Sequence, residues 1–301
     1  MQPPDQLYDI YSDGVPPGLV MLHNLTGFLD AGAAGNMAAQ HLLTHLEHET
    51  VASFDIDSLY DYRARRPRMT FMSDHYGQID LPELTISMLR DQTGTPFLLM
   101  HGPEPDFAWK RFTAAVEEVV DELDVSLVIG MHAVPWPAPH SRPIGVTAHS
   151  ADPTLLGGRA PWVGDLEVPG HVAGLLEIAL DASGHRSMGF VAHVPHYLSG
   201  AEHPASSVAL LESVIVQTGL VLPLDALRES ARRSDVEIDA QVQASDDNRE
   251  AVQMLEAQFD ALLASRASDS GDLNITDLPS GEDIAAQVER FLAQRDSHGT
   301  D

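Results

Sequence analysis

The chain has 301 residues, no cysteine, and 45 acidic against 17 basic residues, which gives a formal net charge of -28. Binding to nucleic acid and to anionic membrane surfaces depends on contacts of Lys and Arg with phosphate groups, so this charge argues against both partners. The absence of cysteine excludes disulfides, thiolate nucleophiles, iron–sulfur clusters and zinc sites built on cysteine.

The start of the chain, MQPPDQLYDI, has neither the basic segment nor the apolar segment of a secretory signal. No window approaches the 18 consecutive apolar residues that a membrane span needs. We therefore expect a cytoplasmic protein. Residues 1–18 are polar, contain four prolines, and are predicted to form a loose lead-in.

Residues 19–220 alternate short apolar runs with amphipathic helix patterns. Such alternation predicts an α/β domain, a three-layer α/β/α sandwich. Residues 60–92 instead predict an antiparallel excursion, which makes the sheet mixed. The expected strands are Leu19–Leu25, Thr50–Phe54, Pro96–His101, Leu127–Met131, Ile144–Thr147 and Met188–Val194, and the expected helices are Ala31–Leu46, Phe107–Leu123, His171–Ala182 and Pro204–Thr218.

Residues 221–301 lose the strand pattern and carry 18 acidic residues and 7 arginines. Two helices are predicted at Pro223–Gln243 and Asp247–Ala264, and a third at Glu282–Gln294. We expect an acidic helical C-terminal region that packs on its own domain or on a neighbouring subunit.

The first candidate site follows the first buried strand, where TGFLDAG leads into an alanine-rich helix. Asp30 is well placed as the N-cap of that helix. Gly27, Asp30 and Gly32 would lie at the carboxyl edge of the sheet, where backbone N–H groups can bind an anion. A tight turn between strand and helix needs the same residues with no ligand, so both interpretations stay open.

A second candidate follows the strand Pro96–His101 in the sequence HGPEPDF. His101, Gly102 and Glu104 would lie at the same edge of the sheet. Glu104 fits a general acid or base at a strand end, and it equally fits a carboxylate that is stabilised near the start of the following helix.

The third candidate is the segment after Leu127–Met131, in which prolines predict a rigid loop at the end of a strand. Its candidate binding residues are His132, Trp136, His140, Arg142 and His149. The three histidines would form a metal site only if they converge, and otherwise they make structural hydrogen bonds. The chain shows no G-x-S-x-G, G-x-G-x-x-G or Walker A motif, so the sequence identifies no catalytic residue and leaves enzymatic activity open, although it weighs against it. We predict no metal and no cofactor.

Several segments together resemble the proteasome assembly chaperone family, in its bacterial, actinobacterial-type branch. They are GFLDAG at 27–32, HGPEPDFAWKRF at 101–112, GMHAVPWPAPHSRPIGVTAHS at 130–150, VPGHVAGLLEIAL at 168–180, HVPHYL at 193–198 and DLPSGEDIAAQVERFLA at 277–293.

The resemblance implies a fold similar to the nucleoside phosphorylase–hydrolase class and a homo-oligomeric protein. Its partners would be other copies of itself, and proteasome subunits or another protein. No catalytic residue of the family carries over to this chain. The alternative is a small-molecule hydrolase or ligase whose pocket, at the carboxyl edge of the sheet, would be lined by Gly27, Asp30, Gly102, His132 and Arg142.

Overall fold

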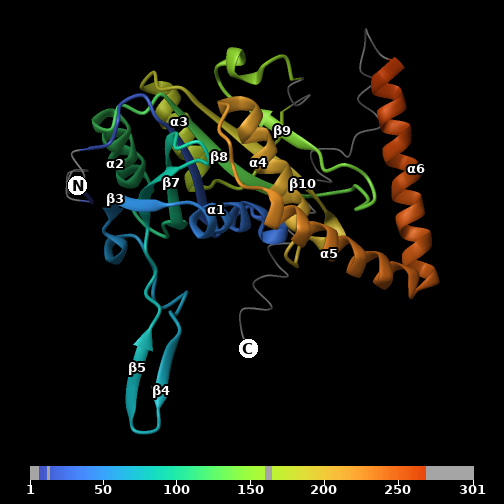
Figure 1. Cartoon of the computed structure of the whole chain (residues 1–301), viewed down its shortest axis with the longest axis horizontal. Helices are drawn as coiled ribbons and strands as arrows, with labels where there is room; N and C mark the ends of the chain where they lie inside the picture. The colour runs from blue at the N-terminus through green and yellow to red at the C-terminus, as the bar shows by residue number, and fades with distance from the viewer. Residues whose placement is uncertain (1–6, 12–13, 160–164, 269–301) are drawn as a thin grey trace. The chain divides into compact units, whose positions relative to one another are not determined.

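The computed structural model describes residues 7–11, 14–159 and 165–268. Eight strands form one mixed sheet in the order β1-β3-β6-β7-β2-β8-β10-β9 (Figure 1). The strands are β1 (Tyr8–Ile10), β2 (Val20–Thr26), β3 (His48–Phe54), β6 (Thr85–Arg90), β7 (Pro96–Pro103), β8 (Leu127–Trp136), β9 (Val146–His149) and β10 (Ser187–Pro195). Strand β2 is parallel to β7 and β8, whereas β6 is antiparallel to β3 and β7. The predicted α/β class with a mixed sheet is confirmed.

The helices lie close to their predicted positions. They are α1 (Ala34–His45), α2 (Trp109–Glu122), α3 (Val172–Ala182), α4 (Pro204–Thr218), α5 (Asp225–Gln243) and α6 (Asp246–Ser268), with short 3-10 turns η2 (Ala31–Ala33), η3 (Ile56–Ser58), η4 (Pro153–Leu156) and η5 (His196–Leu198). A helical C-terminal region is thus confirmed in α5 and α6. The predicted helix Glu282–Gln294 lies outside the described residues. No helix within those residues combines the length and apolar character that crossing a membrane requires.

The chain divides into two compact units that interleave along the sequence. The first comprises Met1–Phe28, Leu43–Gly130 and Gly170–Met188, and the second comprises Leu29–Leu42, Met131–Pro169 and Gly189–Asp301. The boundary at residue 220 that the composition suggests stays a prediction.

The core of the first unit explains why its strands form. Four consecutive residues of β7, Phe97 to Met100, are fully buried. Because successive side chains of a strand point to opposite faces, both faces of this strand are covered, as expected in a three-layer sandwich. The apolar stripe of α2, which includes Phe112, Val116 and Val119, packs in one cluster with apolar residues of α3 and of the strands.

Two elements differ from the predicted pattern. Within the predicted lead-in, Tyr8–Ile10 forms β1 and pairs with β3, with Tyr8 opposite Phe54. Strand β8 continues to Trp136 instead of ending at Met131, so the proline-rich loop starts later than the prolines predict. Pro135 removes one backbone donor near the end of β8, a place where a strand tolerates that loss better than in its centre.

The antiparallel excursion between β3 and β6 is a hairpin that we call the arm. It consists of β4 (Met69–Met72) and β5 (His75–Ile79), which form a separate two-stranded sheet. Every residue of both strands is exposed. Figure 1 shows the arm extending away from β3, β6 and β7 of the same unit.

Candidate functional site

Asp30 caps helix α1 from beyond an intervening 3-10 turn. Its carboxylate oxygens accept hydrogen bonds from the backbone N–H of Gly35 at 2.6 Å and of Asn36 at 2.9 Å. A negative charge at this place also stabilises the positive end of the helix dipole. The amides that an external anion would use are therefore bonded to the chain's own carboxylate, which favours the structural interpretation of this turn.

Gly32 permits a close approach between this turn and the start of helix α4. Its φ of +63° is left-handed, and a Cβ at this position would lie 2.8 Å from the Cβ of His203. The N–H of His203 donates to the carbonyl of Gly32 at 2.9 Å, while the N–H of Gly32 donates to the carbonyl of Ser199 at 2.8 Å. The glycine thus serves packing and backbone pairing.

His203 is a buried titratable group that the sequence does not single out. Its Nδ1 and the Oγ of Ser206 lie 2.8 Å apart, in the first turn of α4. Burial, with a smaller contribution from the nearby His140, lowers the pKa of His203 to about 4. The imidazole is therefore neutral at physiological pH.

Glu104 caps a helix other than the one that follows it in the sequence. Its Oε1 accepts a hydrogen bond from the N–H of Val172, the first residue of α3, at 2.7 Å. His171 is the N-cap residue of α3, and its Nδ1 accepts a hydrogen bond from the N–H of Gly174 at 3.1 Å. The imidazole ring of His171 stacks on the ring of Phe28. Glu104 is thus a carboxylate at the start of a helix, as one of its two interpretations predicts, but the helix is α3 and not α2.

Gly27 and Gly102, both in the first unit, are required by close packing. A Cβ on Gly27 would lie 3.0 Å from the Cβ of Glu104. A Cβ on Gly102 would lie 2.4 Å from the carbonyl oxygen of Glu83 and 2.7 Å from the Cα of Leu84. These contacts are with the chain itself, so neither glycine needs a ligand to explain it.

His101 lies beside these glycines on β7. Its Nε2 is 3.1 Å from the Oγ1 of Thr85 on the neighbouring strand β6. Partial burial lowers the pKa of His101, with a smaller contribution from the nearby His48. The neutral ring therefore forms a cross-strand contact.

His132 and Trp136 belong to β8 and not to a loop. Both are buried, with exposed fractions of 7% and 8%. The indole of Trp136 stacks on the ring of His193, with ring centroids 4.0 Å apart and an interplanar angle of 13°. Nε2 of His193 is in turn 2.8 Å from the Oγ1 of Thr147. Of the interpretations open for Trp136, the structure shows packing inside its own unit.

His140 and His149 lie at opposite ends of β10. The ring of His149 covers Gly189 near the start of that strand, while His140 bonds Tyr197 just beyond its end. At 3.3 Å per residue this separation is roughly 20 Å, so the predicted histidines cannot share one metal ion. Among the described residues, no group of three His, Asp or Glu side chains could hold a metal.

His140 connects the proline-rich loop to two other elements of the second unit. Its Nδ1 lies 2.6 Å from the hydroxyl of Tyr197, and its Nε2 lies 3.1 Å from Oδ1 of Asp239 on α5. The backbone N–H of His140 also donates to the Tyr197 hydroxyl at 2.8 Å. Burial raises the pKa of the Tyr197 phenol, which therefore stays protonated.

Arg142 connects the same loop to α6. Its Nε and Nη2 donate to the two carboxylate oxygens of Asp260 at 2.9 and 2.7 Å, and its Nη1 lies 3.3 Å from Oε1 of Glu256. The guanidinium holds the pKa of Asp260 below its usual range. Ser141 donates to the same carboxylate of Glu256. The loop's polar groups thus bond to the C-terminal helices.

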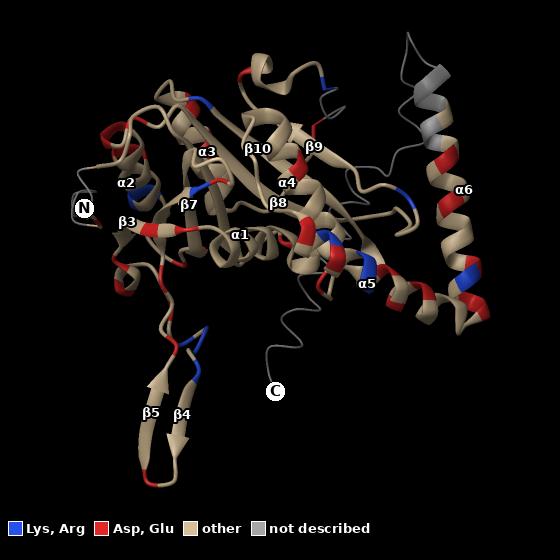
Figure 2. Cartoon of the chain, in the orientation of Figure 1, with Lys and Arg blue, Asp and Glu red and all other residues tan. Residues whose placement is uncertain are grey.

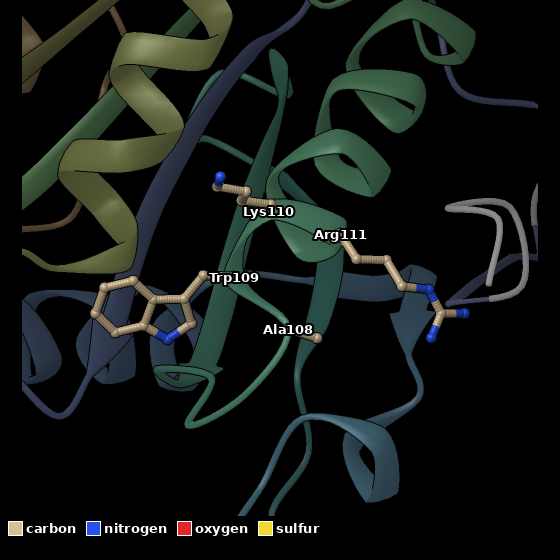
Figure 3. A pocket seen from close by; sticks show the side chains of 4 residues that line it. All are labelled: Ala108, Trp109, Lys110 and Arg111. Atoms are coloured by element: carbon tan, nitrogen blue, oxygen red, sulfur yellow. The ribbon is translucent and has the colours of Figure 1, made fainter. Parts of the chain in front are cut away.

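A shallow hollow of about 340 Å³ lies at the start of α2 and is lined by Ala108, Trp109, Lys110 and Arg111. In Figure 3 the side chain of Arg111 points away from Trp109 and Lys110. The indole N–H of Trp109 donates to the carbonyl of Pro105 at 2.7 Å. The hollow therefore has no set of polar groups that converge on a ligand.

The predicted site residues fall into two groups, one in each unit. Those of the first unit are Gly27, His101, Gly102 and Glu104, and those of the second are Asp30, Gly32, His132, Trp136, His140, Arg142 and His149. Within each unit their hydrogen bonds and packing hold helix starts, strands and loops. The sequence missed their partners, because most of these partners are distant in the chain.

Comparison with known proteins gives the family. The model of the PAC2 family matches residues 24–242. The chain belongs to the PAC2 family. This agrees with the resemblance that the sequence segments carry. A comparison with curated proteins gives no match.

Comparison with solved structures extends the match beyond the residues of the family model. A Mycobacterium tuberculosis protein of unknown function is 43% identical, with 96% of each chain covered and a TM-score of 0.82. A Corynebacterium glutamicum protein of unknown function is 34% identical over 86% of this chain and 98% of its own, with a TM-score of 0.81. A proteasome-assembly chaperone homologue of M. tuberculosis is 27% identical over 78% of this chain and 100% of its own, with a TM-score of 0.72.

The PAC2 match ends inside α5, so α6 lies beyond the family's common part. The first of these structures nevertheless covers 96% of this chain. The ion pairs of Arg142 with α6 therefore involve a helix outside the residues that the family model matches.

Proposed function

We propose that this chain is a protein-binding protein without catalytic activity, which associates with copies of itself and has a role like that of proteasome assembly chaperones. The observation that carries the proposal is the arm. An isolated two-stranded hairpin is marginally stable in water, and this one presents large apolar side chains.

The exposed apolar side chains of the arm are numerous for a segment of its length. Their exposed fractions are 54% for Met69, 59% for Phe71, 54% for Met72, 70% for Tyr76 and 43% for Ile79. Exposed apolar patches of more than a few hundred Å² mark interaction sites in soluble proteins. The arm is therefore proposed as a protein-contact surface.

Charge favours a second copy of this chain as the occupant of that surface. The root of the arm contains Arg63, Arg65, Arg66 and Arg68, which are four of the 17 basic residues of a chain whose net charge is -28. Arg65 pairs with Asp106 of its own chain, so the charge offered to another molecule comes from the other three arginines. No acidic residue interrupts them. Figure 2 shows this basic segment at the base of the hairpin and acidic residues on other elements, among them α2, α5 and α6. A basic segment next to apolar residues complements the acidic surface of another copy.

The chaperone-like part of the proposal rests on the family. The M. tuberculosis relative described as a proteasome-assembly chaperone homologue is 27% identical to this chain. The structural use of Asp30, Glu104 and Arg142 also favours binding over catalysis, because these groups already bond to the chain's own backbone or helices. Proteasome subunits are accordingly the first partners to test.

Sedimentation velocity tests the self-association. The full chain is expected to sediment as an oligomer, and the double variant Phe71→Ser/Tyr76→Ser as a monomer. Ile178→Ser is the matched control, because Ile178 is 68% exposed on α3 of the same unit. It is expected to leave the oligomer intact. A wild-type chain that stays monomeric at the highest attainable concentration would contradict self-association.

Cross-linking tests the partner directly. Because the chain has no cysteine, Asp74→Cys at the tip of the arm gives one site for a maleimide–benzophenone reagent. A covalent dimer of this chain is expected. Products that link the tip only to its own chain would refute a second copy as the occupant. Co-purification with proteasome α subunits at low salt tests the chaperone-like role, and consistent failure there would count against it.

A further inference from the structure

The direction in which the arm points is not fixed by its own strands. Strands β4 and β5 pair only with each other in the part of the chain that the structure describes. Any constraint on the arm must therefore act at its root, between η3 and β4 and between β5 and β6. A surface that docks on another molecule binds more tightly when its orientation is fixed beforehand.

Arg65 connects the root of the arm to the edge of the sheet. Its Nη2 donates to the backbone carbonyl of Glu104 at 2.8 Å and to Oδ2 of Asp106 at 2.5 Å. Its guanidinium also lies over the ring of Tyr60, 4.3 Å from the ring centroid. One side chain thus contacts both the root and the segment after β7.

The two acceptors of the Arg65 hydrogen bonds, in Glu104 and Asp106, are themselves held by other hydrogen bonds. The N–H of Glu104 donates to the carbonyl of Thr26 at the end of β2 at 2.8 Å, and the Glu104 carboxylate caps α3. Oδ2 of Asp106 also accepts from the N–H of Asp61 at 2.6 Å. Arg65 therefore binds a segment that is fixed to a central strand and to a helix.

The aromatic side of the contact is also fixed. Tyr60 packs edge-to-face against Tyr62, with ring centroids 5.0 Å apart. The hydroxyl of Tyr62 donates to Oδ1 of Asp57 at 2.7 Å, a bond that raises the pKa of Tyr62 to about 12. The phenol stays protonated, and the contact persists over the whole physiological pH range.

The neighbouring Arg66 provides a contrast. Its side chain is exposed and forms no hydrogen bond or ion pair with any residue that the structure describes. The two arginines are adjacent and carry the same charge, yet only Arg65 contacts the segment 104–106.

We propose that Arg65 is a positioning residue, which fixes the direction of the arm relative to the sheet and thereby prepares it for docking on a second copy. This inference rests on the proposed function, in which the arm is the contact surface. If loss of Arg65 leaves the arm correctly directed in one molecule in ten, the apparent dissociation constant rises roughly tenfold.

Electron spin–spin distance measurements test the direction of the arm without requiring association. Nitroxide labels at Asp74→Cys on the arm and Asp181→Cys on α3 report one distance within the first unit, and dilution with unlabelled chain removes signals between copies. The expected distribution is narrow in the wild type and in Arg66→Ala, and broad in Arg65→Ala. Arg65→Lys is expected to be intermediate, because an ammonium keeps the charge but not the planar fork.

Sedimentation then tests the consequence for association. Arg65→Ala is expected to weaken self-association at both low and high salt, whereas the effect of Arg66→Ala should vanish at high salt because it is only electrostatic. An unchanged distance distribution in Arg65→Ala overturns the inference and leaves the proposed function standing. A monomeric wild type overturns the proposed function and docking on a second copy, while the distances still decide whether Arg65 fixes the arm.

Discussion

Replacing Gly102 with alanine tests whether this glycine serves packing or a ligand. The new Cβ would lie 2.4 Å from the carbonyl oxygen of Glu83 and 2.7 Å from the Cα of Leu84. Both are backbone atoms of the segment that enters β6, so they cannot move aside as a flexible side chain can. The φ of +144° at this position is in addition unfavourable for any residue with a side chain.

The expected cost combines these two effects. Overpacking in a well-packed region costs about 1–3 kcal/mol, and alanine at a positive φ costs about 1 kcal/mol more. We expect Gly102→Ala to lower the free energy of unfolding by about 3 kcal/mol. At about 2–4 °C per kcal/mol for a chain of this size, Tm falls by about 6–12 °C.

Gly94→Ala is the matched control, because Gly94 has a φ of +86° but no atom within 4 Å of the new Cβ. It is expected to cost only about 1 kcal/mol. Thermal and denaturant unfolding, followed by circular dichroism, measure both variants. A Gly102→Ala protein as stable as Gly94→Ala would refute the close approach and would restore Gly102 as a candidate for binding.

Three further changes have defined outcomes. Asp30→Ala should destabilise the protein by about 2 kcal/mol in denaturant unfolding, and Asp30→Asn by about half as much, because the amide keeps an acceptor but loses the charge. The pKa of His203 is lowered from 6.5 to about 4 in the folded protein, so between these pH values the unfolded chain binds a proton that the folded protein does not. The contribution of His203 to stability is therefore complete above pH 6.5, and the free energy of unfolding falls by about 3 kcal/mol as the pH is lowered to 4. In His203→Asn the free energy of unfolding should lose that part of its pH dependence. Arg142→Ala should accelerate amide hydrogen exchange in α6 but not in α2. If α6 exchanges at the same rate in the variant and in the wild type, the ion pairs of Arg142 do not hold α6 on the loop.

The sequence predicts most of the elements because their patterns are local. The apolar run before TGFLDAG indicates β2, and Asp30 at the following turn indicates the start of a helix. The proline rule fails at β8, where a strand with Pro135 continues to Trp136. A buried stack on His193 stabilises that extension, and the sequence gives no sign of it.

The contacts of the candidate residues are beyond local patterns. Glu104 caps a helix 68 residues later, and Arg142 pairs with a carboxylate 118 residues later. Each residue type allows several roles, and only the tertiary structure selects one. The arm is predicted as an antiparallel excursion, but its isolation from the main sheet depends on the absence of a neighbouring strand, which a single sequence does not specify.

The interleaving of the two compact units limits how this protein can be divided. Each unit is assembled from three separate stretches of the chain. No continuous fragment therefore contains all of one unit without part of the other, and no single crossover between related genes can exchange one unit for another. During synthesis the second unit, which begins at Leu29, stays incomplete until the stretch that starts at Gly189 has left the ribosome. The two units therefore cannot be expressed, exchanged or completed during synthesis independently of each other.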